Sequence, residues 1–156
     1  MSNPINLNWV LKAPGDTTAV EVAGAFEARG GLLVSTGRVR EVLTPTDVDA
    51  QNNTLTVAQI VAGIVVHTSV TGGGTVTTDT AANIIAGASG VGALTADGQC
   101  ITCYYVNDGS QTLTFAGGTS VTIADTGGTI LTNQACTVIF RRASSTTVTC
   151  YVMAGT

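Results

Sequence analysis

The chain has 156 residues, of which 44% are hydrophobic, and its net charge is −4 with only six Lys and Arg. This balance argues against a nucleic-acid groove, which needs a basic stripe to displace counterions, and no apolar run reaches the ~18 residues of a membrane span. Charged residues make up only 10% of the chain, against roughly 25% in soluble domains. We interpret the resulting Thr-, Ser- and Gly-rich surface as one that packs against copies of itself or other subunits, in preference to that of a Thr-rich extracellular domain.

Residues 1–50 are predicted to form an N-terminal arm or a small β region, and residues 51–156 a separate domain. Most of the charge lies in the first region, and the composition shifts at a polar stretch after Asp49. Pro4 and Pro14 bracket a segment that alternates polar and apolar residues up to Trp9. Such a segment can pair with a neighbour's sheet edge or form an edge strand of its own subunit. The N-terminus lacks the pattern of a secretory signal, which predicts synthesis in a cytosol.

Two short helices are predicted early in the second region. Thr56 and Gln59 have the spacing of a capping box, so a helix is expected to begin there and to end at Gly63. A second helix is expected after Asp79 or Thr80, because either side chain can accept hydrogen bonds from the free amides of a first turn.

The remainder reads as short strands that alternate polar and apolar residues. The predicted strands span residues 64–70, 100–106, 111–115, 120–123, 135–141 and 147–153. Asp108-Gly109 favours a primed turn, which predicts a tight hairpin between the second and third of these strands. Strands spaced by roughly 8–12 residues predict an all-β fold, an antiparallel β-sandwich or barrel with one or two short helices.

The four cysteines do not form a convincing redox or zinc motif. Cys100 and Cys103 lie three apart in a predicted strand and therefore face opposite sides. Buried free thiols are the favoured interpretation. A disulfide between Cys136 and Cys150 stays an alternative, which the distance between the two residues decides. His67, the only histidine, has no acid nearby in sequence, so we interpret it as a structural or surface side chain.

No catalytic, metal-binding or cofactor-binding residues are predicted, and no cofactor. Asp47 and Asp49 lack the further ligands of a calcium loop. The glycines at 72–74 are not followed by the Lys-Ser/Thr of a phosphate-binding loop. Tyr104 and Tyr105 place one ring on each face of a strand, one for the core and one for a sugar or a neighbouring subunit.

Several segments in a fixed order carry a family resemblance. They are Leu55–Gly63 leading into Ile64-Val-Val, Thr78–Ile85, Tyr105–Asn107, Gln111–Gly118, Thr132–Arg141 and Val148–Val152. In this order, residues 55–152 resemble a recurring C-terminal module of phage and large-virus virion proteins. The resemblance covers about two thirds of the chain and contains no catalytic motif. It implies a small jelly-roll-like β-sandwich that assembles as a trimer in head decoration, fibre or spike proteins.

The resemblance therefore implies a virion structural protein, a homotrimeric capsid decoration (cement) protein made in the host cytoplasm. Its implied partners are itself and the major capsid protein or other virion proteins, with no nucleic acid and no membrane. The residues expected to anchor it to the capsid are Ile5, Leu7, Trp9 and Leu11. Those expected at the subunit interface are Tyr104, Tyr105, Phe140, Arg141 and Arg142. The alternative is a fibre tip that binds a receptor or host-surface glycan, and a hydrolase dependent on His67 is a third, disfavoured interpretation.

Overall fold

The computed structural model describes residues 43–68, 71–89, 92–124 and 128–154. The strands are β1 (Thr44–Val48), β2 (Asn53–Leu55), β3 (Gly63–His67), β4 (Gly74–Thr78), β5 (Cys100–Asn107), β6 (Leu113–Ala116), β7 (Val121–Ile123), β8 (Thr129–Ile130), β9 (Gln134–Arg142) and β10 (Val148–Ala154). The helices are α1 (Val57–Ala62) and α2 (Ala81–Ala86). No helix among these residues is long and apolar enough to cross a membrane.

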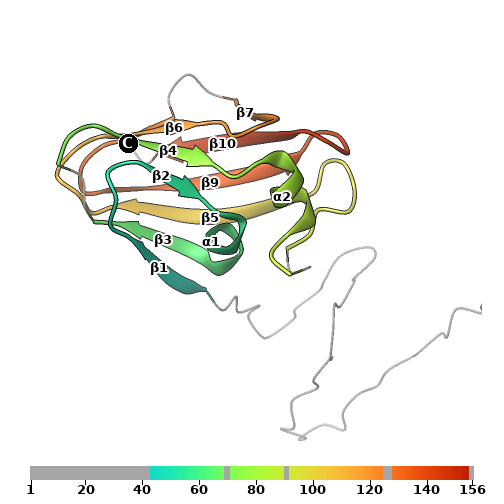
Figure 1. Ribbon diagram of the computed structural model, residues 1–156, viewed down its shortest axis with the longest axis horizontal. Helices are drawn as coiled ribbons and strands as arrows, with labels where there is room; N and C mark the ends of the chain where they lie inside the picture. Colours follow the sequence, from blue (N-terminus) through green and yellow to red (C-terminus); the bar gives the residue numbers. More distant parts are fainter. Residues whose placement is uncertain (1–42, 69–70, 90–91, 125–127, 155–156) are drawn as a thin grey trace, which may run out of the picture. The chain divides into compact units, whose positions relative to one another are not determined.

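Two sheets face each other across one core (Figure 1). The larger has six strands in the order β1-β3-β5-β9-β10-β7, and the smaller has four in the order β2-β4-β6-β8. From β1 to β6 the chain changes sheet after every strand. Strands two apart in sequence consequently become parallel neighbours, as in the pairs β1–β3, β3–β5, β2–β4 and β4–β6.

The prediction of an all-β antiparallel, jelly-roll-like sandwich was wrong. The described residues form an α/β two-sheet fold with short helices, and its mixed sheets are mostly parallel. Only the pairs β5–β9, β9–β10 and β6–β8 are antiparallel. The error has a physical cause: alternation shows that one face of a strand is buried, but a strand that crosses to the opposite sheet buries its face as well as one that turns back.

The tight hairpin predicted at residues 107–110 is the clearest local example. Neither central residue of that turn has a positive φ. Instead, the buried Asn107 accepts a hydrogen bond from the Gly109 N–H (3.1 Å), which closes an Asx turn. Its Nδ2 donates to the backbone oxygens of Gln111 (2.7 Å), Ile130 (3.2 Å) and Leu131 (3.1 Å). Asn107 thus directs the chain from β5 into the other sheet and joins two segments there, the one that leads into β6 and the end of β8.

Both predicted helices are confirmed, together with the capping box. The Thr56 N–H donates to Gln59 Oε1 (2.9 Å), and the Gln59 N–H donates to Thr56 Oγ1 (3.4 Å). Gly63 ends α1 in the left-handed region at φ 88°. The N-cap of α2 is Thr80. The Asp79 carboxylate accepts hydrogen bonds from the backbone N–H groups of Val57 (2.9 Å) and Thr80 (2.7 Å), at the starts of the two helices.

The two helices lie at the opposite end of the sandwich from three of the connections between strands. Figure 1 shows α1 and α2 toward one end, while the β1–β2, β3–β4 and β5–β6 connections lie at the other. Between the two ends, alternate residues of each strand fill the core. The Tyr105 ring of β5 meets the Phe115 ring of β6 edge-on, with 5.2 Å between ring centroids, and so joins the two sheets.

The predictions made for residues 1–42 lie outside the described residues, including the anchoring residues Ile5, Leu7, Trp9 and Leu11. Thr44–Val48, which the sequence assigned to the N-terminal region, forms β1 of the six-stranded sheet and pairs in parallel with β3.

Candidate functional site: the outer face of the six-stranded sheet

The side of the six-stranded sheet that points away from the core carries most of the large exposed apolar side chains of the described residues. Tyr104 is 44% exposed, Tyr151 38% and Met153 54%. They alternate with the buried residues of β5 and β10, as the period of a strand requires.

Strand register brings these side chains together. One row across the sheet runs Met153–Thr137–Tyr104, and the next runs Tyr151–Ile139–Thr102. Opposite residues in a row have Cβ atoms about 5 Å apart, so the six form one continuous patch. We call these six residues the docking face. None of them is charged, and Arg141 lies beside the patch, on the next outward position of β9.

The outer face of the four-stranded sheet differs in chemistry. Its exposed strand positions are Thr54, Thr75 and Thr114. Thr75 and Thr114 are register neighbours. The other exposed large apolar residue of the described chain, Leu131 (53%), follows β8. The two faces therefore differ: one shows threonine to water, and the other shows Tyr, Ile and Met.

The structure separates the residues predicted at a subunit interface. Tyr105 and Phe140 are fully buried between the sheets, where no partner can reach them. Tyr104 belongs to the docking face, and Arg141 is exposed beside it. As expected from alternation, the two adjacent tyrosines face opposite sides of β5.

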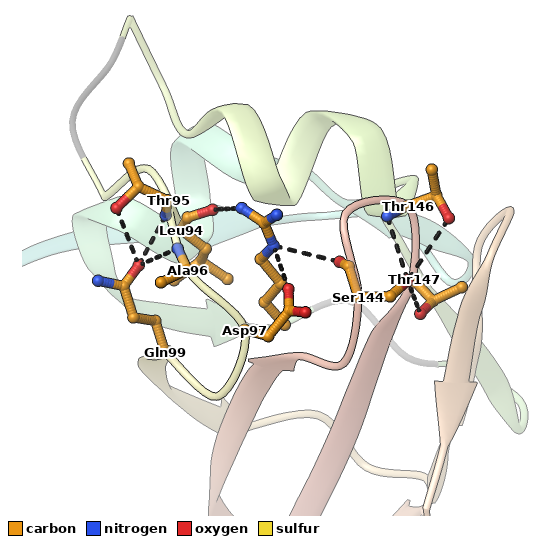
Figure 2. Close-up of polar contacts among 9 residues, drawn as sticks. Leu94, Thr95, Ala96, Asp97, Gln99, Ser144, Thr146 and Thr147 are labelled. Carbon is orange, nitrogen blue, oxygen red and sulfur yellow. Dashed lines mark hydrogen bonds and ion pairs between the residues drawn. The ribbon is translucent and has the colours of Figure 1, made fainter.

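Arg142 is bound within its own chain. Its Nε donates to Asp97 Oδ1 (2.9 Å) and to the Ser144 carbonyl (3.2 Å), and its Nη1 donates to the Leu94 carbonyl (2.7 Å). Figure 2 shows the segment from Leu94 to Gln99 facing the turn that contains Ser144. The guanidinium thus fastens the connection between α2 and β5 to the β9–β10 turn, and its side chain is only 15% exposed.

Replacing Arg142 by Met is expected to lower the free energy of unfolding by about 2 kcal/mol, because two backbone carbonyls lose a charged donor. The Asp97 pair adds little, since that carboxylate is 61% exposed. Denaturant unfolding measures the loss, and limited proteolysis should show faster cleavage between residues 87 and 99. Arg141→Met, a matched change one residue away, is expected to alter stability by less than ~0.5 kcal/mol; equal losses in both variants would contradict this assignment.

The cysteines confirm the thiol interpretation for three positions. Cys103, Cys136 and Cys150 are buried and free, whereas Cys100 is exposed and free. Burial raises the pKa of each of the three buried thiols to about 12, so they are protonated and apolar. Cys150 lies opposite Phe140, four residues from Cys136, a separation of about 13 Å along the strand that excludes the disulfide.

His67 is buried, with both ring nitrogens hydrogen-bonded. Asp47 is an exposed residue of β1, and Asp49 lies in the connection that follows. Within the described ranges, no group of three His, Cys, Asp or Glu side chains is placed to hold a metal ion.

The sequence interpretation missed Ile139, Tyr151 and Met153. A signal was present, because Tyr151 and Met153 alternate with the apolar residues Val148, Cys150 and Val152. Their place beside Tyr104 depends on the register of the strands, which the alternating pattern does not reveal. Comparison with family models, with curated proteins and with solved structures finds no match to this chain.

Proposed function

We propose that this protein is a virion structural protein, a capsid decoration protein that acts as a homo-oligomer by adhesion. The observation that supports this best is the docking face, an uncharged patch of tyrosine, isoleucine, methionine and threonine on an exposed sheet. Exposed apolar patches of this kind mark interaction surfaces, and depletion of charge is characteristic of an interface core. The resemblance to virion modules suggests the same role and a trimer, although the jelly-roll-like fold that it implied is not the fold of this chain.

A second copy of this chain is the occupant we propose for the docking face. The six-stranded sheet offers roughly 600 Å² on this side, from the ordinary spacing of strands and residues. Three such faces that meet about a three-fold axis, as in a trimer, together bury up to about 1,800 Å², which lies in the range of a stable specific interface. The tyrosine hydroxyls and threonines can hydrogen-bond across the contact, so few polar groups would be left without partners.

Oligomeric state tests this use of the docking face. Light scattering on the full-length chain at tens of micromolar should give a trimer mass. The double variant Tyr104→Lys/Met153→Lys should be a monomer with an unchanged circular dichroism spectrum, because like charges would meet across the interface.

The matched control is Thr75→Lys/Thr114→Lys, which adds the same charge to the other sheet and should leave the trimer intact. A monomeric parent chain, or a trimer that survives the docking-face change, would overturn self-association through this surface.

Capsid binding tests the decoration role itself. We propose that residues 1–50 contact the major capsid protein, with Trp9 and its apolar neighbours as the anchor. The full-length chain should co-sediment with capsids stripped of accessory proteins, and Trp9→Ala should weaken this binding without changing the oligomer. If the parent chain binds no capsids but binds host-surface glycans, the fibre-tip alternative replaces decoration.

A further inference from the structure

A layer of buried polar side chains lies at the end of the sandwich that carries the β1–β2, β3–β4 and β5–β6 connections (Figure 1). His67 ends β3 and Asn107 ends β5; the two are register neighbours and both are fully buried. Asn53 of β2 lies across the core from them, within reach of the Tyr105 hydroxyl. Buried polar groups are costly unless paired, so the hydrogen bonds of this layer determine how the end is held.

The partners of His67 determine which of its nitrogens carries the proton. Nε2 lies 2.6 Å from the Ala50 carbonyl oxygen, and Nδ1 lies 2.8 Å from the Tyr105 hydroxyl. A carbonyl only accepts, so Nε2 must be the protonated nitrogen. In a neutral ring Nδ1 is then an acceptor, and the Tyr105 hydroxyl must donate to it.

Asn53 extends this chain of bonds. The Tyr105 hydroxyl lies 3.4 Å from Asn53 Oδ1, yet its single proton is already used by His67. Asn53 Nδ2 is buried without a hydrogen-bond partner among the described residues. Amide oxygen and nitrogen are assigned from such networks. Exchanging them lets Nδ2 donate to the hydroxyl oxygen and leaves an unpaired acceptor, which is tolerated better than an unpaired donor.

We propose that His67 is an acid-sensitive lock on this end of the sandwich. With His67 neutral, the bonds run from Asn53 to Tyr105 to His67 to Ala50. With His67 protonated, Nδ1 becomes a donor, the Tyr105 hydroxyl must turn to Asn53, and Asn53 must present its oxygen. Protonation therefore reverses the bonds among Asn53, Tyr105 and His67 and leaves the buried Asn53 Nδ2 without a partner among the described residues, which weakens the attachment of β2 to the core; the bond from Nε2 to Ala50 is kept.

The surrounding groups set the direction of the pH dependence. Burial lowers the pKa of His67, while the hydrogen bond to Ala50 and the charge of Asp49 in the β1–β2 connection act in the opposite sense. β5 contributes Tyr105, whose pKa is raised by burial, and β1 contributes the apolar Val48 at this level. Because the folded pKa lies below 6.5, the stabilisation is complete above pH 6.5 and is lost as the pH falls toward the folded pKa.

Thermal unfolding of the full-length chain tests the lock. The unfolding midpoint should fall by roughly 3 °C between pH 7.5 and pH 5, and His67→Gln, which cannot take up the proton, should remove that fall. An equal fall in both chains would overturn the proposal.

Nitrogen NMR gives a second test, which does not depend on a change in stability. The chain contains a single histidine, so the imidazole signals belong to His67. At pH 7.5 the ring should be the Nε2–H form. Asn53→Asp should raise its titration midpoint by at least one pH unit, since the introduced carboxylate accepts from Tyr105 and makes Nδ1 a donor. Asn52→Asp adds the same charge one residue away, where the side chain accepts from the Thr75 N–H (2.9 Å), and should shift it far less. A proton on Nδ1 at pH 7.5, or equal shifts in the two variants, would refute the proposal.

Discussion

Asn107→Asp is expected to lower the free energy of unfolding by about 4 kcal/mol at pH 7, the cost of a buried charge for which the Gly109 N–H remains a hydrogen-bond donor. The substitution keeps the shape of the side chain but replaces Nδ2 with an oxygen. That oxygen would face three backbone carbonyls, those of Gln111, Ile130 and Leu131, which now accept from Nδ2. The negative ends of three carbonyl dipoles and the anionic oxygen would then converge in a site that excludes water.

Urea unfolding of the full-length protein measures this loss, and the pH dependence identifies its cause. A protonated carboxyl can donate to one of the three carbonyls, so part of the stability should return at pH 4 relative to the parent chain. Asn52→Asp is the control, because its exposed side chain only accepts a hydrogen bond and a carboxylate can do the same. A loss below ~1 kcal/mol in Asn107→Asp would show that the three carbonyls do not depend on this donor.

Gly118→Ala is expected to cost about 3 kcal/mol, the upper range for overpacking. A Cβ at this position would lie against the carbonyl oxygens of Thr78 and Asp79, closer than real Cβ atoms approach. Those carbonyls are part of the backbone where β4 leads into α2, so they cannot rotate away as a flexible side chain would. The Gly118 N–H also donates to Thr78 Oγ1 (2.9 Å), and moving the loop would break that bond.

Gly73→Ala provides the matched comparison. There the nearest heavy atom to a new Cβ is 3.9 Å away and φ is not positive, so the change should be neutral or should stabilise by up to ~1 kcal/mol through the unfolded chain. Thermal unfolding of both variants with the parent decides the issue. Similar midpoints for the two alanine variants would show that the loop at Gly118 relaxes without cost.

Local structure in this protein was predictable wherever neighbours in sequence decide it. Thr56, Gln59 and Gly63 settle α1 through bonds that span four residues or fewer, and the β9–β10 pair follows from two alternating strands joined by a short turn. The topology depends on distant partners. Asn107 sits before an Asp-Gly pair that ordinarily turns a hairpin, but its Nδ2 bonds to Ile130 and Leu131, more than twenty residues away, direct the chain across the core.

The candidate site likewise depends on contacts between residues that are distant in sequence. Alternation predicts that Tyr104 and Tyr105 point to opposite faces of β5. It also puts Phe140 on the same face of β9 as Cys136 and Val138, which are buried. What alternation cannot supply is the alignment of β5, β9 and β10 that unites Tyr104 with Met153. Arg142 illustrates the point again, because its partners Asp97 and Leu94 lie more than forty residues before it.

The position of β10 has a consequence for the order in which the protein acquires its structure. β10 lies between β9 and β7, and among the described strands β7 is paired only with β10. During synthesis β7 must therefore wait for β10 to leave the ribosome, although β7 emerges earlier. Closing such a long loop delays folding, and until then one edge of the growing sheet is open to neighbouring nascent chains. Completion of the larger sheet is thus a late event in folding.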